Sequence, residues 1–404
     1  MWEKSFPFSF GDRWFLIIML LDAIRKGDSE SHQGDYMRDV FLNRRDFCKA
    51  IAAGGALLAG AAAFSGCATT TSEQAAAQAL SDDGTGVYTL VYASNNSANA
   101  AMYKNVEHEL LQRIHDATNG RIVINEYLAS ALTKAGEGRN AVLNDICDIV
   151  FDSPSWYSGT FPLTTLTEMP LGFKSGKALS FTLRDLIQKY KPAEYEGFKV
   201  LCPMSSGPRC LISNTPVRQL EDMKNLQVRA SATSAAIVRS WGAVPTTISS
   251  SDVYEALQNN LVDSGLFSYE SMAASHYYDI CDYLTDLSPV STNVVIYMSQ
   301  EKFDALPKDL QEIIEKVCSE FFEEVGASFW AEYREDAVAV AKAGNSNFQW
   351  FTLDDDETQR WVDASASLTE SYVQKATDAG YDGPEVLEWI KSTYAAYEKL
   401  YPAK

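Results

Sequence analysis

Apolar and polar residues alternate between Gln219 and Glu270 in a pattern that predicts three short strands separated by two helices. Leu226–Arg229 reads apolar, polar, apolar, polar, which is the period of a half-buried strand. The predicted elements are, in order, a strand at 226–229, a helix at 232–241, a strand at 243–247, a helix at 252–258 and a strand that opens at 261. Strands joined by helices usually pair in parallel, so this segment predicts a parallel sheet with helical crossovers.

The rest of the chain beyond residue 85 continues the mixture of strands and helices, so the predicted fold class is α/β. A strand at 88–94 precedes an amphipathic helix at 100–118. Leu306-Pro307 precedes a long helix whose apolar residues recur every three or four positions, more weakly as far as Ala343. The other predicted elements are strands at 121–126, 148–152, 199–202 and 348–353, and helices at 137–144, 355–375 and 384–400.

Polar and aromatic side chains follow several predicted strands, where an open α/β sheet places its ligand. Asn95, Ser153 and Trp156 lie at such strand ends. Arg229 ends the strand at 226–229, and Arg209 lies twenty residues before it. Two arginines on neighbouring parallel strands would hold one carboxylate through charge-assisted hydrogen bonds. Asn and Ser are also common in turns, and a lone strand arginine is often solvated, so a purely structural role stays open for each.

The net charge of the protein excludes some classes of function. The 404 residues carry a formal net charge of −20, and residues 1–66 hold eight acidic and eight basic side chains, so the rest of the chain carries the whole excess. A nucleic-acid-binding protein needs a basic face, and the sequence shows none. Long-range steering cannot draw an anionic ligand to so acidic a chain, so a local arginine would have to bind it.

The sequence contains no motif of a nucleotide-binding, hydrolytic or metal-dependent enzyme, so we expect no catalysis, no cofactor and no metal site. Its seven cysteines include no C-x-x-C pair. Cys202 and Cys210 flank a turn, and the sequence leaves open whether they are bridged or are buried free thiols.

Residues 1–67 have the features of an export leader. Arg44 and Arg45 form a twin-arginine run, and an apolar stretch rich in Ala and Gly follows it as far as residue 66. That stretch is too short to span a membrane stably. The sequence leaves open whether translation starts at Met1 or at Met37.

The leader ends at Phe64-Ser65-Gly66-Cys67, which resembles a lipobox, the signal in which a lipid is attached to the cysteine. Residues 68–85 are rich in Ala, Ser, Thr and Gln, a composition that predicts a flexible tether. We therefore expect an extracytoplasmic protein that is exported by the twin-arginine route and anchored to the membrane through Cys67.

Several runs together resemble one family, the substrate-binding proteins of tripartite ATP-independent periplasmic (TRAP) transporters of the dicarboxylate type. Family members carry a run similar to Met223–Arg229, then G-A-x-P as in Gly242–Pro245, then a run similar to Tyr254–Asp263. The earlier part of the chain is similar as well, in Asn119-Gly120-Arg121, Asp148-Ile149, Phe161-Pro162 and Met169–Phe173. The resemblance thus covers essentially all of the folded part.

The resemblance implies a two-lobed fold like that of periplasmic binding proteins, with a long helix spanning both lobes. The implied lobes are residues 86–206 with 295–334, and residues 207–294 with 335–404, closing on the ligand by a hinge. It also implies that Arg229 pairs with the carboxylate of an organic acid, that Arg209 is a second arginine beside it, and that the ligand is handed to TRAP permease subunits in the membrane.

One position departs from part of the family. Several members have a polar Asn where this chain continues into Phe267, which favours a ligand less polar than a sugar acid, although a core position for Phe267 is the simpler interpretation. A ligand-sensing lipoprotein or an extracytoplasmic enzyme on the same scaffold stays open as an alternative, because a fold does not fix a function.

Overall fold

The structure, a computed structural model, describes residues 86–230, 233–248, 252–287 and 290–403. The predictions for the leader at 1–67, including Cys67, and for the tether at 68–85 lie outside the described residues. Within the described part, no helix has both the length and the apolar character needed to cross a membrane.

The first of two sheets has five strands in the order β2-β1-β3-β10-β4. They are β1 (Tyr88–Ala93), β2 (Ile122–Tyr127), β3 (Ile149–Asp152), β4 (Phe198–Ser205) and β10 (Asn293–Ser299). β1 pairs in parallel with β2 and β3, whereas β10 runs antiparallel to both of its neighbours.

Helices cover both faces of this sheet, and its strands are mostly buried except for the edge strand β2. They include α4 (His108–Ala117), α5 (Gly138–Leu143), α10 (Gln300–Ala305) and α11 (Lys308–Phe321). Leu90 and Tyr92 of β1 belong to the apolar cluster that includes α4 and α11. Val91 and Ala93 belong to the cluster that includes α5, because successive side chains of a strand point to opposite faces.

The second sheet has six strands in the order β11-β9-β5-β8-β6-β7. They are β5 (Arg209–Ser213), β6 (Gln227–Arg229), β7 (Val244–Thr246), β8 (Ser264–Phe267), β9 (Tyr283–Leu287) and β11 (Gln349–Thr352). Helices α7 (Thr233–Ser240), α8 (Val253–Gln258) and α9 (Tyr269–Ala274) belong to the same lobe. β6 pairs in parallel with β7 and β8, so the parallel sheet predicted for the segment 219–270 is confirmed.

Two crossover segments join the sheets and pair with each other. Residues 206–208 lead from β4 to β5, and residues 290–292 lead into β10. Ser206 N donates to Thr292 O at 2.8 Å, Thr292 N donates to Ser206 Oγ at 3.0 Å, and Arg209 N donates to Val290 O at 3.0 Å. Backbone hydrogen bonds therefore fix the place where the chain passes between the lobes.

A glycine pair lets helix α6 (Gly176–Tyr190) approach this junction. A Cβ atom on Gly176 would lie 2.9 Å from the Cα atom of Gly207, which is closer than such atoms pack. Gly207 also has a φ of +62°, a left-handed conformation that favours glycine. Side chains at these two positions would push the helix away from the crossover.

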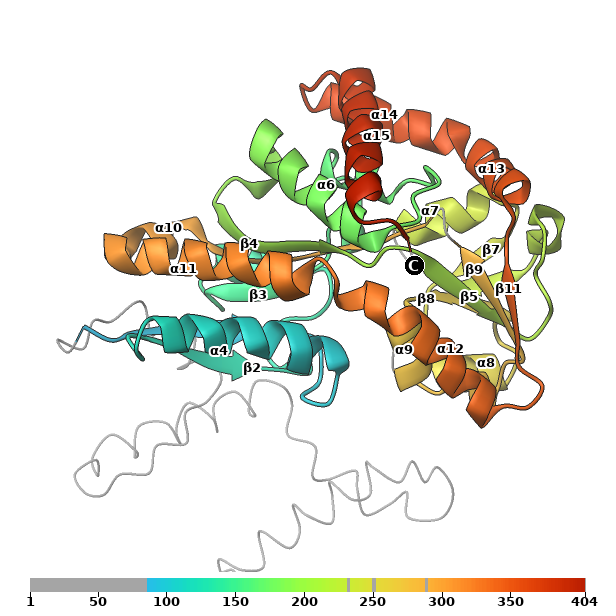
Figure 1. Ribbon diagram of the computed structural model, residues 1–404, viewed down its shortest axis with the longest axis horizontal. Helices are drawn as coiled ribbons and strands as arrows, with labels where there is room; N and C mark the ends of the chain where they lie inside the picture. The colour runs from blue at the N-terminus through green and yellow to red at the C-terminus, as the bar shows by residue number, and fades with distance from the viewer. Residues whose placement is uncertain (1–85, 231–232, 249–251, 288–289, 404) are drawn as a thin grey trace, which may run out of the picture. The chain divides into compact units, whose positions relative to one another are not determined.

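The predicted long helix is confirmed as a helical run from one lobe to the other, and its hydrogen bonding changes in the middle. The run consists of α11, a π-helical turn at Phe322–Gly326, a 3₁₀ turn at Phe329–Glu332 and α12 (Tyr333–Gly344). α11 packs on α4 and β4 in the first lobe, whereas α12 packs on α9 in the second (Figure 1).

The π-helical turn in this helical run lies where the run comes into close contact with the first sheet. A Cβ atom on Gly326 would lie 2.9 Å from Cys202 Sγ and 3.4 Å from Met204 Sδ, both on β4. Glycine at this position is what allows the run to lie directly on the strand before it turns toward the second lobe.

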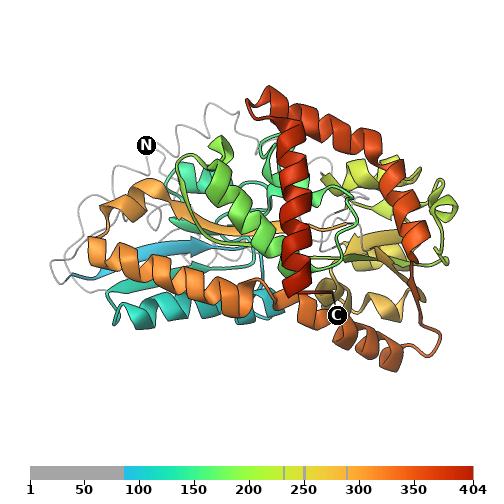
Figure 2. The same cartoon turned by 45° about the horizontal axis from the view of Figure 1, so that its top comes forward.

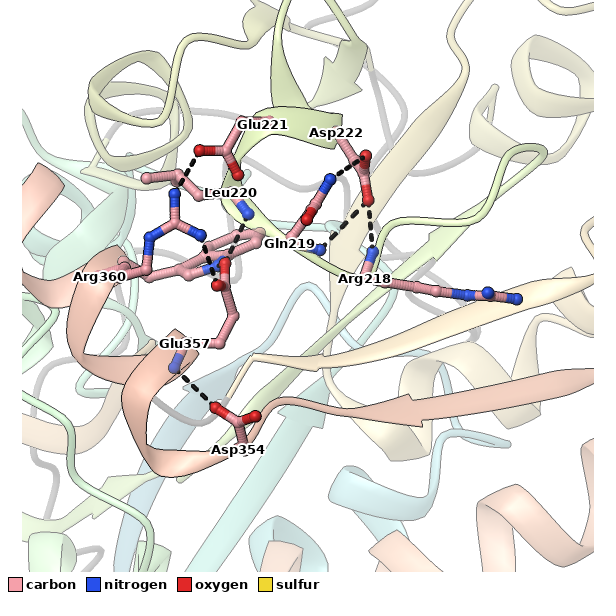
Figure 3. A network of polar contacts seen from close by, with 9 residues as sticks. Arg218, Gln219, Leu220, Glu221, Asp222, Asp354, Glu357 and Arg360 are labelled. Carbon is pink, nitrogen blue, oxygen red and sulfur yellow. Dashed lines mark hydrogen bonds and ion pairs between the residues drawn. The ribbon is translucent and has the colours of Figure 1, made fainter.

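Three helices close the chain, α13 (Asp355–Ala364), α14 (Ala366–Asp378) and α15 (Gly383–Leu400). α13 docks on the second lobe through the polar network of Figure 3: Arg360 pairs with Glu221, and Glu357 Oε1 accepts hydrogen bonds from Leu220 N at 2.6 Å and from Trp361 Nε1 at 2.8 Å.

The last helix lies with the first lobe, although residues 335–404 were expected in the second. α15 packs against α6 at an oblique angle (Figure 2), and its Tyr394 ring stacks on Phe173 at 4.0 Å. The Tyr394 hydroxyl also accepts hydrogen bonds from Lys174 N and Ser175 N, both at 2.8 Å. The chain thus passes between the lobes again before it ends.

Replacing Gly326 with alanine tests the close contact with β4. Alanine favours helix by about 1 kcal/mol over glycine, but overpacking costs about 1–3 kcal/mol, so we expect a net loss in the free energy of unfolding. Urea unfolding measures it. Cys202→Ala removes the opposing sulfur, so the double variant should lose less than the sum of the two single losses. Strictly additive losses would contradict the contact.

Candidate ligand site

Arg209 opens β5 beside the crossover, and most of its side chain is enclosed. Its Nη1 donates to Thr292 Oγ1 and its Nη2 donates to Leu266 O, both at 3.0 Å. Its buried Nε has no hydrogen-bond partner among the described residues. Burial lowers the pKa of Arg209 to about 10, the Arg229 cation also lowers it, and Glu168 raises it. The guanidinium therefore stays charged at neutral pH.

Arg229 ends β6, and its position corrects the expectation of two arginines on neighbouring parallel strands. β8 lies between β5 and β6, and β5 runs antiparallel to β8. The start of β5 and the end of β6 therefore meet at the same edge of the sheet, which brings both arginines there. Arg229 Nε donates to Ile248 O at 3.3 Å, and burial lowers the pKa of this guanidinium.

Phe267 ends β8 and forms an apolar wall beside Arg229. The guanidinium carbon of Arg229 lies 5.5 Å from the centre of the Phe267 ring, and the centre of the Tyr277 ring lies 4.6 Å from that of Phe267. Phe267 is only 5% exposed, so the side chain belongs to the core of the second lobe and also borders the arginine.

Ser153 follows β3 and lies in a buried polar network of the first lobe. Its Oγ donates to Asn293 O at 2.6 Å and lies 2.7 Å from Ser155 Oγ. Asn293 N in turn donates to Glu168 Oε1 at 2.8 Å, and Asn293 Nδ2 donates to Thr167 Oγ1 at 2.7 Å. Because Glu168 also interacts electrostatically with Arg209, this network connects Ser153 to the arginines.

Glu168 and Asn293 were missed in the sequence. Glu168 is the single charged residue between Phe161 and Phe173, a signal for a buried functional or structural carboxyl group. Burial raises the pKa of Glu168 to about 8, while the hydrogen bond from Asn293 N and the charge of Arg209 lower it. The carboxyl group is therefore mostly neutral at pH 7.

Asn95 and Trp156 complete the set of predicted site residues. Ala93 of β1 pairs with Val150 of β3, so Asn95 lies at the same sheet edge as Ser153, as expected for two strand ends. The Oδ1 atom of Asn95 is buried without a hydrogen-bond partner among the described residues. Trp156 lies 6.3 Å from Phe151, ring centre to ring centre, on the 3₁₀ turn at Pro154–Trp156, which contacts α7 of the second lobe.

Two sizeable cavities lie elsewhere. A cavity of about 890 Å³ lies between α6, β4 and α11, and one of about 550 Å³ lies between the start of α6, the start of α12 and the C-terminal residues. Neither is lined by Arg209, Arg229, Ser153 or Phe267. The candidate site is defined by its enclosed polar groups.

The cysteines of the described part are free and buried, so Cys202 and Cys210 are not bridged. They lie on different sheets, Cys202 on β4 and Cys210 on β5, and burial raises the pKa of Cys210 to about 12. Within the described ranges, no group of three or more His, Cys, Asp or Glu side chains could hold a metal ion.

Two α/β lobes joined by paired crossovers, with guanidinium groups enclosed where they meet, define a binding protein of the periplasmic type. The chain belongs to the family described as bacterial extracellular solute-binding protein, family 7, whose sequence model matches residues 92–376.

Three relatives illustrate the match. The chain is 31% identical to a TRAP periplasmic solute-binding protein from Desulfovibrio salexigens, with a TM-score of 0.70 over 77% of this chain and 96% of that one. It is 23% identical to the C4-dicarboxylate-binding periplasmic protein DctP of Vibrio cholerae over 67% of this chain and 82% of the relative. A TRAP solute-binding protein from Rhodoferax ferrireducens, in complex with benzoate, has the same fold, with 18% identity and a TM-score of 0.71 over 78% of this chain and 99% of that one.

The raised pKa of Glu168 predicts that stability depends on pH. Because the folded value of about 8 exceeds the ordinary value of 4.5, the neutral group stabilises the fold at low pH, and that stabilisation is lost as pH rises toward 8. Glu168→Gln stays neutral. Between pH 5 and pH 8 the free energy of unfolding of the native protein should therefore fall relative to the variant, by a few kcal/mol at most.

Urea unfolding of both proteins at pH 5, 6.5 and 8 measures this difference. Arg209, Tyr195 and Tyr372 are the titratable groups that interact with Glu168, and none of them changes charge in this range. A constant difference between the two proteins across the range would show that Glu168 is already ionised at pH 5.

Proposed function

We propose that this protein captures an organic carboxylate outside the cytoplasm and delivers it to a TRAP-type permease in the membrane. The observation that carries the proposal is the pair of largely enclosed arginines, Arg209 and Arg229, at one edge of the second sheet. Family membership makes the protein a solute-binding protein, and the arginines make an anion its natural ligand.

The charge of the protein supports a local rather than a long-range mechanism. A carboxylate that leaves water needs partners that replace its hydration. On a chain of net charge −20, only nearby cations supply an attractive potential. The relatives support the same ligand class, since one is named for C4-dicarboxylates and another was found with benzoate.

The remaining predicted residues take supporting roles in this proposal. Ser153 and Asn95 offer polar atoms from the edge of the first sheet, while Trp156 and Phe267 supply apolar surface. The two lobes close on the ligand by a hinge at the crossovers near Ser206 and Thr292. Movement there would bring the polar edge of the first lobe toward the arginines of the second.

Arg229→Ala tests the proposed site. Truncating one partner of a buried charge pair costs about 2–5 kcal/mol, so carboxylate binding should weaken by that amount while the protein stays folded. Arg229→Lys should recover only part, because an ammonium group cannot form the planar pair of bonds. Arg239→Ala, an exposed arginine of the same lobe, is the matched control.

Calorimetry with a library of carboxylates measures the affinities, and circular dichroism checks the fold of each variant. Unchanged affinity in folded Arg229→Ala protein would remove Arg229 from the site and leave Arg209 as the better candidate.

The proposal includes the route to the membrane. Arg44 and Arg45 direct export by the twin-arginine pathway, and Cys67 carries the lipid that anchors the mature protein, with residues 68–85 as the tether. Arg44→Lys with Arg45→Lys should leave the protein in the cytoplasm, and Cys67→Ala should leave it without lipid. Cell fractionation with lipid labelling measures both. Mature, lipid-free protein in the cytoplasm of wild-type cells would exclude this route.

A further inference from the structure

By hydrogen-bond geometry, three buried polar atoms near the arginines have no partner within the described protein: Arg209 Nε, Glu168 Oε2 and Asn293 Oδ1. The nearby Ser155 hydroxyl group also lowers the pKa of Glu168. Buried polar groups almost always have a partner, because leaving one unpaired is costly. Three unpaired polar atoms on neighbouring residues indicate a subsite for a polar group of a ligand.

The three residues are in direct contact or close to it. Asn293 N donates to Glu168 Oε1 at 2.8 Å, and Arg209 donates to Thr292, the neighbour of Asn293, at 3.0 Å. Glu168 is 1% exposed and Asn293 is fully buried. Two of these groups therefore come from the first lobe, and the third comes from the second.

Their hydrogen-bonding capacities specify what fits. Arg209 Nε carries a hydrogen and can only donate, while Asn293 Oδ1 can only accept. Burial raises the pKa of Glu168 to about 8, and because Oε1 already accepts a hydrogen bond from Asn293 N, the proton of the neutral form resides on Oε2. The cluster thus offers two donors and one acceptor.

We propose that Glu168, Asn293 and Arg209 Nε form a subsite that recognises a hydroxyl group next to the carboxylate of the ligand, which makes 2-hydroxy acids the preferred class. A hydroxyl group has one hydrogen to donate and two lone pairs to accept with, so its hydrogen-bonding capacity matches the two donors and one acceptor of the cluster. A keto oxygen leaves Asn293 Oδ1 unpaired, and a hydrogen in place of the hydroxyl group leaves all three unpaired.

The proximity of carboxylate and hydroxyl follows from the shared guanidinium. This inference rests on the proposed function, in which Arg209 and Arg229 hold the ligand carboxylate. Nε and the Nη atoms belong to one rigid planar group, so a hydroxyl group at Nε lies next to a carboxylate at the Nη edge. The carbon beside the carboxylate is the one that places an oxygen there.

Calorimetry with matched acids tests the subsite in the purified protein. The acids are lactate, pyruvate and propionate; mandelate, benzoylformate and phenylacetate; and malate with succinate. Within each series that binds, the 2-hydroxy acid should bind at least about tenfold more tightly than its analogues, since each analogue leaves buried polar atoms unpaired. Equal affinities within every series that binds would overturn the subsite, and would fit a water molecule bridging the three atoms.

Two variants of one residue sharpen the result. Glu168→Gln keeps an acceptor for Asn293 N and a donor in place of Oε2, so it should keep the preference for the hydroxy acid. Glu168→Met has neither and should reduce the preference several-fold or more. Glu312→Met, the same change at an exposed position of α11, is the control. Loss of the preference in Glu168→Gln, or its retention in folded Glu168→Met, would remove Glu168 from the subsite.

The outcomes separate this inference from the proposed function. If acids bind, Arg229→Ala weakens them all and no series shows a preference, the proposed function stands and the subsite falls. If the preference exists but Arg229→Ala changes neither the preference nor the affinity, the carboxylate binds elsewhere and the role proposed for Arg229 is wrong. If no acid of any series binds the native protein, both fall.

Discussion

The pairing of the two crossover segments is the constraint on which the rest of the structure depends. Its backbone hydrogen bonds, from Ser206 to Thr292 and from Arg209 to Val290, hold the chain where it passes between the sheets. Arg209 is the first residue of β5, and Asn293 is the first residue of β10. The groups that face each other between the lobes are therefore placed by the backbone, and the close contact of Gly176 with Gly207 seats α6 against the same junction.

The local electrostatic potential at this junction is set by its buried groups and not by the net charge of the protein. The protein carries a formal charge of −20, yet the groups enclosed here include two guanidinium ions and a carboxyl group with a raised pKa. When Glu168 is neutral, the positive charges of Arg209 and Arg229 are both retained. An ionised Glu168 would cancel one of these two charges. Removing this carboxyl group from water thus preserves the local potential that an anionic ligand needs on an acidic protein.

Much of the second sheet could be predicted because its signals are local. The alternation at Leu226–Arg229 and the helix stop at Asn259-Asn260 mark β6 and α8 without any tertiary information. The position of β5 could not be predicted in this way. It enters beside β8 in the antiparallel direction, and nothing in its own sequence specifies a neighbour. Arg209 was therefore assigned to a strand next to that of Arg229, although β8 separates the two.

Long-range packing accounts for the other differences. The apolar spacing after Leu306 continues past Gly326, so the sequence predicts one helix, whereas the contact with Cys202 on β4 accompanies a π-helical turn there. The lobe to which α15 attaches depends on Tyr394 meeting Phe173 and on its hydroxyl meeting Lys174 N, contacts between residues about 220 positions apart. Sequence periodicity identifies that helix but contains no information about its partner.

The candidate site combines what could and could not be predicted. The strand-end rule selected Asn95, Ser153 and Trp156, and the pairing of β1 with β3 puts Asn95 and Ser153 at one edge of the first sheet. It could not identify Glu168, which lies on a 3₁₀ turn, although its isolation in an apolar segment was a signal.

Polar and aromatic groups are distributed unevenly around the two arginines. The polar atoms without partners lie near Arg209, whereas Phe267 and Tyr277 border Arg229 with aromatic surface. A ligand that matches both has its carboxylate between the two arginines, one further polar group near Arg209 and an apolar remainder against the Phe267 ring. A sugar acid, with hydroxyl groups along its whole length, would have to bury some of them against the Phe267 ring, which offers no hydrogen bond. The distribution of polar atoms around the two arginines thus favours a compact, largely apolar acid.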